Sequence, residues 1–449
     1  MPIPVSRFGH LVHALQSVMR LHEPADANLH NYFRIHRELG SQDRAFVAEN
    51  VYAALRRKRF LEHLIGPLSP GSLPKAPAEL PEDKGESDEV PLHEARVTAS
   101  PRQLALATLM KLQGINAREL APLLLDSEEE WLKQLKAKSS ADLPLAVQAD
   151  FPDWLMEKLA TFMSEADILA LARGMQQPAP LDLRVNTLLD KRDEVLHTLV
   201  NSDGIAAEIT PYSPLGLRLK DKPSLNKNSL FIKGKIEVQD EGSQLIGLLL
   251  APQRREMVVD FCAGAGGKTL LIGALMQNSG RVYAFDVSEK RLNNLKPRLK
   301  RSGLSNLHPQ LIANENDLKI KRLAGKIDRV LVDAPCSGFG TLRRNPDMKW
   351  RQTPEGIAEL TQRQAAILLA ASRLLKTGGR LVYAICSFLP EENQQVVEAF
   401  LAQHPEFKLL DASEILASQH VPLNTGKYLQ LLPHVHGTDG FFAAVMERV

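Results

Sequence analysis

The chain has 449 residues and a mass of 49.8 kDa, more than one ordinary domain, so two or three domains are expected. Hydrophobic residues make up 44% and charged residues 24%, which excludes a disordered or fibrous chain. The 55 Lys and Arg nearly balance the 53 Asp and Glu, which excludes nucleic-acid binding by bulk charge alone but not by a local basic face. No apolar run reaches the ~18 residues of a bilayer span, and the N-terminus lacks a signal-peptide core, so we expect a cytoplasmic protein without membrane contact.

Helical patterning dominates the N-terminal part of the chain. In residues 42–55 large apolar side chains recur at steps of three and four, the period of a helix, and similar patterning runs from 101 to about 175. Residues 67–100 between them are rich in proline and acids and predict a flexible acidic loop. We therefore expect one all-α domain, residues 1–66 and 101–175, interrupted by an insertion.

The period changes near residue 178. Residues 181–186 alternate with period 2, residues 190–201 have a helical pattern, and two short strands are expected at 205–209 and 215–219. These elements predict a small α+β module over residues 178–235.

Strands and helices then alternate. The expected strands are 257–261, 281–286, 310–313, 329–333, 380–385 and 441–445. This alternation predicts a doubly wound, Rossmann-like α/β domain over residues 236–449, which binds ligands at the carboxyl ends of its strands.

A glycine-rich loop, Cys-Ala-Gly-Ala-Gly-Gly-Lys at 262–268, follows the first of these strands. Glycines at a strand-to-helix turn let the backbone approach a ligand and direct helix amides toward it. Asp286 ends the next strand, where this fold places a carboxylate on ribose hydroxyls. The pattern favours an adenosine-containing cofactor over a simple tight turn, without saying which cofactor.

Two of the three cysteines, Cys336 and Cys386, follow the fourth and fifth strands. A single cysteine is usually a small buried hydrophobe, but two at neighbouring strand ends above a cofactor loop favour chemistry. The three cysteines lack metal-ligand spacing, so no metal is expected, and they fit a reducing compartment.

Paired thiols suit a reaction that makes and then breaks a covalent adduct. A thiolate that adds to C6 of a pyrimidine turns C5 into a carbon able to accept a methyl group from a sulfonium donor. The C5 proton must then leave, which requires a second group. Asp333, three residues before Cys336, can reach the ring N3 and stabilise charge there.

These residues resemble a known family. Asp-Ala-Pro-Cys-Ser-Gly at 333–338 and Tyr-Ala-Ile-Cys-Ser at 383–387 are similar to the paired motifs of the S-adenosylmethionine-dependent RNA 5-methylcytosine methyltransferases. The resemblance covers nearly the whole chain, and its further segments are 43–46, 152–155, 238–243, 262–268, 341–350 and 438–442. Arg-Arg-Asn-Pro-Asp-Met-Lys-Trp at 343–350 and a NusB-like, RNA-binding helical domain point to the bacterial members that modify 16S ribosomal RNA.

The resemblance implies a role for each site residue. Cys386 is the expected nucleophile, Cys336 assists breakdown of the adduct, and Asp333 lies between cofactor and base. The expected cofactor is S-adenosylmethionine, with Lys268 on Asp333 or on the target base. The cofactor-binding residues implied are Cys262, Ala263, Gly264, Ala265, Gly266, Gly267, Lys268, Asp286, Asn314, Asp317 and Asp333.

Two positions depart from the family pattern. Gly264-Ala265 stands where Ala-Pro is usual, which should alter the stiffness of the loop more than its chemistry. Asn-Glu-Asn-Asp at 314–317 replaces the usual Gly-Asp after the third strand. Spacing favours Asn314 as the adenine contact, whereas residue type favours Asp317.

Basic residues gather near the site, and Arg343 and Arg344 are the expected RNA contacts. The expected function is methylation of C5 of a cytosine in 16S rRNA by a monomer. Three alternatives stay open: the same chemistry on tRNA or another RNA, a non-catalytic rRNA-binding assembly factor, and a Rossmann dehydrogenase. The cysteine pair speaks against the last two.

Overall fold

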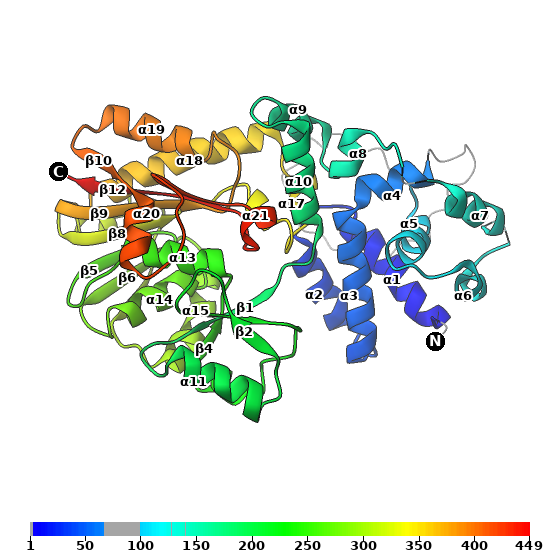
Figure 1. Cartoon of the computed structure of the whole chain (residues 1–449), viewed down its shortest axis with the longest axis horizontal. Helices are drawn as coiled ribbons and strands as arrows, with labels where there is room; N and C mark the ends of the chain where they lie inside the picture. The colour runs from blue at the N-terminus through cyan, green and yellow to red at the C-terminus, as the bar shows by residue number, and fades with distance from the viewer. Residues whose placement is uncertain (1–2, 67–98, 127, 140) are drawn as a thin grey trace. The chain divides into compact units, whose positions relative to one another are not determined.

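The structure, a computed structural model, describes residues 3–66, 99–126, 128–139 and 141–449. The acidic loop expected at 67–100 lies outside these residues except for its last two. The chain forms two compact units, which are described separately: Met1–Gln176 with Asn345–Arg351, and Gln177–Arg344 with Gln352–Val449 (Figure 1).

The first unit is helical throughout its described residues, as expected. Its core is formed where α1, α3 and α5 pack together, with Leu11, Val51 and Leu106 fully buried. The helices are α1 (Val5–Val18), α2 (Ala25–Ile35), α3 (Ser41–Arg56), α4 (Lys58–Ile65), α5 (Pro101–Ala107), η1 (Thr108–Leu112), α6 (Ala117–Leu120), η2 (Ala121–Leu123), α7 (Glu129–Ala137), α8 (Leu145–Ala149), α9 (Asp153–Ala160), α10 (Glu165–Gln176) and α17 (Met348–Arg351).

Helix α17 comes from much later in the chain than its neighbours in this unit. Lys349 Nζ donates to the Arg56 carbonyl at 3.0 Å and lies 3.8 Å from Asp150 Oδ1, and Trp350 Nε1 donates to the Leu55 carbonyl at 3.2 Å. Both carbonyls lie in the last turn of α3, which a cation stabilises. Burial lowers the pKa of Lys349 to about 8.

The second unit contains a small antiparallel sheet in the order β2-β3-β1-β4. Alternate residues of its strands, among them Leu183, Leu217 and Ile236, are buried beneath α11 and η3. The strand β4 lies beyond the expected end of the module at residue 235. The elements are β1 (Leu181–Val185), α11 (Arg192–His197), η3 (Thr198–Ser202), β2 (Ala207–Ile209), β3 (Gly216–Leu219), α12 (Ser229–Ile232) and β4 (Ile236–Val238).

The same unit contains a large sheet, which has eight strands among the described residues, in the order β10-β12-β9-β8-β5-β6-β7 with β11 beside β12. The strands β5 to β9 are parallel, and β12 is antiparallel to β9. The strands are β5 (Met257–Asp260), β6 (Arg281–Asp286), β7 (Leu307–Leu311), β8 (Ile327–Asp333), β9 (Leu375–Ile385), β10 (Phe407–Leu410), β11 (Tyr428–Leu431) and β12 (Phe441–Arg448).

The expected doubly wound α/β fold is confirmed, with one strand displaced. The third parallel strand was predicted at 310–313, after Pro309, but β7 spans Leu307–Leu311 and includes this proline. Proline is tolerated there because β7 is the edge strand and pairs only with β6 in the described chain.

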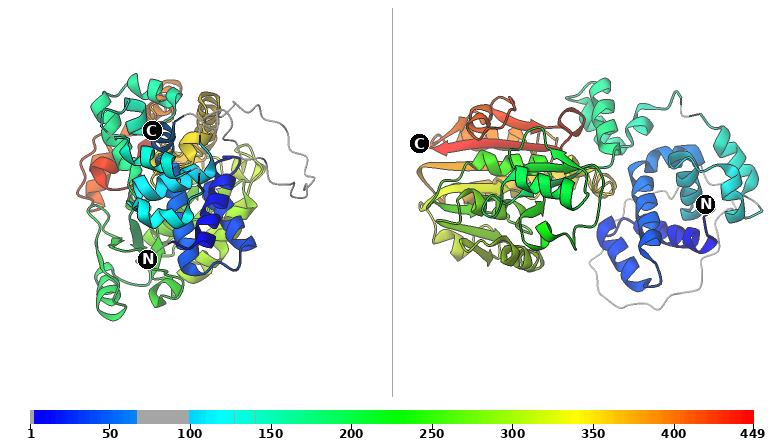
Figure 2. Two further views of the ribbon diagram at one scale, coloured as in Figure 1. Left: turned by 90° about the vertical axis from the view of Figure 1, so that its right-hand side faces the viewer. Right: turned by 60° about the horizontal axis from the view of Figure 1, so that its bottom comes forward.

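Helices cover both faces of the large sheet (Figures 1 and 2). The helices α13, α14 and α20 bury one face, and α18 and α19 bury the other. These helices are joined by α15, which packs against β6 and β7, and by the short helices α16, η4 and α21. Their bounds are α13 (Glu241–Leu250), α14 (Gly267–Leu275), α15 (Glu289–Ser302), α16 (Leu318–Lys321), η4 (Phe339–Thr341), α18 (Pro354–Ser372), α19 (Gln394–Gln403), α20 (Ala412–Ser418) and α21 (Pro433–His436).

Because β5 to β9 are parallel, the loops that follow these strands lie at one edge of the sheet. Helices cover both faces of the sheet, so ligands of such a fold bind at this edge. Among the helices of the described ranges, none has the length and hydropathy that a bilayer span requires.

We expect Lys349→Met to lower the free energy of unfolding of the first unit by about 1–3 kcal/mol, because a buried carboxylate and a helix-end carbonyl each lose a partner. Urea unfolding followed by circular dichroism measures this loss. Lys133→Met, which removes a lysine whose side chain is 69% exposed, is the control and should change nothing measurable. Equal effects of the two substitutions would contradict the structural role of Lys349.

Candidate active site

The two predicted thiols meet at the edge of the large sheet. The strand β8 ends at Asp333 and β9 at Ile385, so Cys336 and Cys386 lie on adjacent loops. Their Sγ atoms are 3.4 Å apart. Both sulfurs can therefore reach neighbouring atoms of the same substrate.

A buried glutamate, Glu392, joins the loops that carry the cysteines. Its carboxylate accepts hydrogen bonds from the amide of Ser337 at 2.8 Å, from the hydroxyls of Ser337 and Ser387 at 2.5 Å each, and from Gln364 Nε2 at 3.0 Å. Each serine directly follows a cysteine. Because Glu392 and Ser337 are fully buried, this contact limits how far the two sulfurs can separate.

The surroundings of Cys336 favour its neutral thiol form. The hydrogen bond with Cys386 and burial raise the pKa of Cys336 well above its ordinary value, and the charge of Glu392 acts in the same direction. Cys336 therefore keeps its proton at neutral pH.

The glycine loop after β5 adopts a ligand-binding shape. Gly264 and Gly266 have positive φ angles of 57° and 81°, and the Gly264 amide donates to Asp286 Oδ2 at 2.8 Å. A Cβ at Gly266 would lie 2.1 Å from Leu295, whereas a Cβ at Gly264 would meet nothing within 4 Å. The loop therefore packs tightly at Gly266 and borders open space at Gly264, beside the carboxylate expected to bind ribose.

Two arginines outside the loop hold its carbonyl groups. Arg184 Nη1 donates to the Gly267 carbonyl at 2.7 Å, and Arg298 Nη1 donates to the Ala265 carbonyl at 2.6 Å. Arg298 also forms an ion pair with Glu237 at 3.0 Å. The sequence did not predict this role for Arg184, which lies in β1 with no local motif around it.

A lysine–aspartate pair lies beside the thiols. Lys268 Nζ donates to Asp333 Oδ2 at 2.8 Å, one of the two contacts expected for this lysine. Burial opposes its charged form, but Asp333 outweighs burial and raises the pKa of Lys268. Nearby, Asp260 accepts from the Thr269 hydroxyl at 2.6 Å, and burial raises the pKa of Asp260 to about 7.

Arg343 and Arg344 contact carboxylates. Arg343 Nη2 donates to Asp439 Oδ1 at 3.1 Å, and Arg344 binds Asp439 at 2.5 Å and Asp240 at 2.9 Å. The Arg343 side chain is 6% exposed and the Arg344 side chain 33% exposed, and the RNA contacts expected of both stay predictions. Asp240 and Asp439 account for the ion pairs of both arginines, because a charged carboxylate is costly to bury without a partner.

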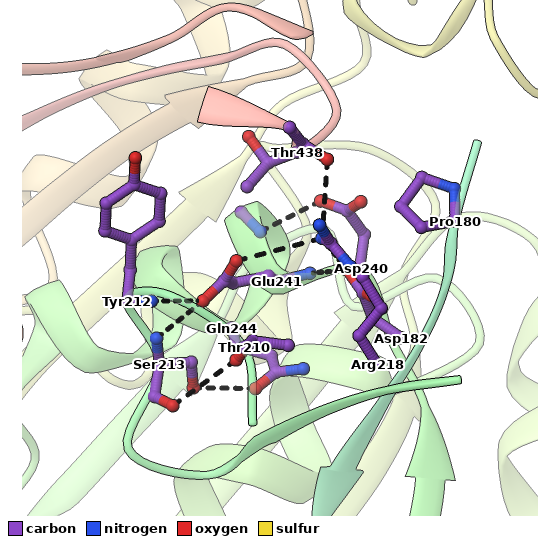
Figure 3. A network of polar contacts seen from close by, with 12 residues as sticks. Pro180, Asp182, Thr210, Tyr212, Ser213, Arg218, Asp240, Glu241, Gln244 and Thr438 are labelled. Atoms are coloured by element: carbon purple, nitrogen blue, oxygen red, sulfur yellow. Dashed lines mark hydrogen bonds and ion pairs between the residues drawn. The ribbon is translucent and has the colours of Figure 1, made fainter. Parts of the chain in front are cut away.

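This polar network extends into the small sheet (Figure 3). Arg218 donates to both oxygens of Asp182 in β1, at 2.7 and 2.9 Å. Glu241, at the start of α13, accepts from the amides of Tyr212 and Ser213 at 2.6 and 2.7 Å (Figure 3). The small sheet is thus fixed to the large one by buried charged groups.

The two candidates for the adenine contact lie in the turn after β7. Asp317 is the N-cap of α16, where it accepts from the amides of Lys319 at 2.8 Å and Ala313 at 2.9 Å. These bonds lower the pKa of Asp317. The Asn314 side chain accepts from the Asn316 amide at 2.9 Å and is exposed. Both side chains thus bind backbone amides of this turn, and the adenine contact stays a prediction for either residue.

Comparison with known proteins identifies two regions of the chain. A model of the 16S rRNA methyltransferase RsmB/F family matches residues 247–447, and one of the ferredoxin-like domain of RsmF/B-like methyltransferases matches residues 151–226. The first match covers the large sheet and both cysteines. The second begins before the expected module boundary at residue 178.

Similar whole proteins include probable ribosomal RNA small subunit methyltransferases B. The protein of Synechocystis sp. is 34% identical, covering 91% of this chain and 92% of its own, and that of Bacillus subtilis is 30% identical, covering 92% of each.

Solved structures agree. The crystal structure of PH0851 matches with a TM-score of 0.77 at 25% identity over all of both chains. A methyltransferase homolog from Pyrococcus horikoshii matches with a TM-score of 0.59 at 28% identity, over 70% of this chain and 100% of that one. The resemblance seen in the sequence is confirmed, and the chain belongs to the RsmB/F family of 16S rRNA methyltransferases.

Proposed function

We propose that this protein methylates C5 of a cytosine in 16S rRNA through a covalent bond between Cys386 and C6 of the base. The observation that carries this proposal is the 3.4 Å separation of two thiols at the sheet edge that also holds the glycine loop. The relatives named small subunit methyltransferase B support 16S rRNA as the substrate rather than tRNA.

The residues at this edge fit S-adenosylmethionine, which supplies an electrophilic methyl group when bound. Asp286 offers a carboxylate to ribose hydroxyls, and the open space at Gly264 leaves room for the ligand beside it. Val287, the next residue after Asp286, is 62% exposed and offers an apolar surface to a base. Asn314 is our candidate for the adenine contact.

The chain's own side chains divide the work on the cytosine. The Cys386 thiolate adds to C6 while N3 takes up a proton from the Lys268–Asp333 pair, and N3 returns this proton when C5 accepts the methyl group. After C5 has accepted the methyl group, its proton must leave. Cys336 assists the transfer of this proton to water, the electrons of the C5–H bond re-form the C5–C6 double bond, and the C6–S bond to Cys386 breaks, which returns the thiolate.

Replacing each cysteine separates these roles. We expect Cys386→Ala to abolish methyl transfer to 16S rRNA because no group remains to activate C5. Cys336→Ala should accumulate a protein–RNA adduct that survives denaturing electrophoresis, because the methylated adduct cannot break down. Labelled S-adenosylmethionine and 16S rRNA transcripts measure both outcomes, with the wild-type protein as the reference. Full activity of Cys386→Ala would overturn the proposal.

We expect Glu392→Gln to lower kcat by roughly 10- to 100-fold, since positioning errors at a reacting centre cost about this much. Glutamine has an NH₂ group in place of one carboxylate oxygen, so it cannot accept all the hydrogen bonds that Glu392 accepts from Ser337, Ser387 and Gln364. Binding of S-adenosylmethionine should not change, because the Glu392 carboxylate binds Ser337, Ser387 and Gln364, which lie outside the glycine loop. Glu398→Gln, on the exposed face of α19, is the matched control. An unchanged kcat in Glu392→Gln would show that the thiols need no such support.

Arg298 and Arg301 allow a paired test of the loop. Both bind Glu237, but Arg298 also donates to the Ala265 carbonyl. We expect Arg298→Gln to weaken S-adenosylmethionine binding roughly tenfold, the effect of losing about one hydrogen bond. Equilibrium dialysis measures the change, and Arg301→Gln should show little. Equal weakening in both variants would assign the effect to Glu237 instead.

A further inference from the structure

Two histidines and a glutamate converge in the helical unit, away from the cysteines in sequence. His10 lies on α1, and His36 and Glu38 lie in the turn after α2. One side-chain ligand atom of each lies within 4.8 Å of the others, and within the described ranges these three form the one such group of His, Cys, Asp and Glu.

The distances between the ligand atoms are close to those of a metal site. Glu38 Oε1 lies 2.9 Å from His36 Nδ1 and 3.8 Å from His10 Nε2. Tetrahedral ligands at 2.0–2.1 Å from Zn²⁺ are roughly 3.3 Å apart, so small side-chain movements suffice. The side chains of His10, His36 and Glu38 are 20%, 31% and 61% exposed, so an ion can reach them from solvent.

Tyr32 supports the outward nitrogen of His10. Its hydroxyl lies 2.9 Å from His10 Nδ1 and donates to the His10 carbonyl at 3.3 Å. Because the hydroxyl donates its hydrogen bond to the carbonyl, it accepts one from Nδ1–H. His10 Nε2 then presents a lone pair toward Glu38. Metal-binding histidines commonly have such an outer partner.

We propose that His10, His36 and Glu38 bind one Zn²⁺ ion. Two imidazole nitrogens and one carboxylate oxygen are a ligand set that Zn²⁺ accepts, and water completes the fourth position. The ion joins α1 to the end of α2, so it stabilises the helical unit in proportion to its occupancy. The site is separate from the methyl-transfer chemistry and does not depend on it.

Titration of the metal-free full chain with Zn²⁺, in competition with a chromogenic chelator, tests the proposal. We expect one equivalent bound by wild type and lost in both His36→Gln and Glu38→Gln, with circular dichroism confirming that the variants fold. His13→Gln, an exposed histidine on the same helix, should bind as wild type does. Retention of the equivalent in His36→Gln and Glu38→Gln would overturn the proposal.

Cys336 and Cys386, which lie 3.4 Å from each other, also offer a pair of ligands to Zn²⁺. A second measurement therefore separates the two sites. The Cys336→Ser, Cys386→Ser double variant should keep the equivalent, and X-ray absorption should show only N and O ligands at about 2.0–2.1 Å. A sulfur ligand at about 2.3 Å, or loss of the equivalent in the double variant, would assign the ion to the cysteines. Tyr32→Phe keeps the ring but removes the hydroxyl, and should weaken binding by roughly 10- to 100-fold.

Discussion

The buried carboxylate of Glu392 connects the two loops on which the chemistry depends. A sheet edge alone brings loops into the same region, but it does not set the distance between two side chains on them. The hydrogen bonds from Ser337 and Ser387 to one carboxylate impose that distance, because both donors are adjacent to a cysteine and are buried. The 3.4 Å approach of the sulfurs follows from this contact together with the pairing of β8 and β9.

Charged side chains elsewhere in the second unit also serve structure before they serve binding. Arg184 is fully buried and holds a carbonyl of the glycine loop, and Arg343 neutralises Asp439. Asp182 and Asp439 would be costly to bury alone, and each is matched by an arginine from a distant part of the sequence. The number of basic residues near the site therefore overstates the basic surface that RNA can reach.

The sequence predicted the features that depend on short segments. Periodicity located the parallel strands, and the strand ends placed Cys336 and Cys386 together, because neighbouring parallel strands share an edge. Contacts between segments far apart in sequence were missed: Glu392 has no spacing relation to Cys336, and Arg184 lies in another sheet. The His10 and His36 pair was missed for the same reason, since metal-ligand spacing describes ligands on one segment. Whether 16S rRNA contacts Arg344 stays a prediction.

The covalent bond between Cys386 and the base is the central claim, and 5-fluorocytidine tests it most directly. A fluorine at C5 cannot leave as a proton does, so the methylated adduct cannot break down and the nucleophile stays attached to the RNA. We expect wild-type protein, incubated with S-adenosylmethionine and 16S rRNA containing 5-fluorocytidine, to form a stable adduct that peptide mass spectrometry assigns to Cys386. An adduct at Cys336, or normal labelling of ordinary 16S rRNA with no adduct on the fluorinated RNA, would contradict the account.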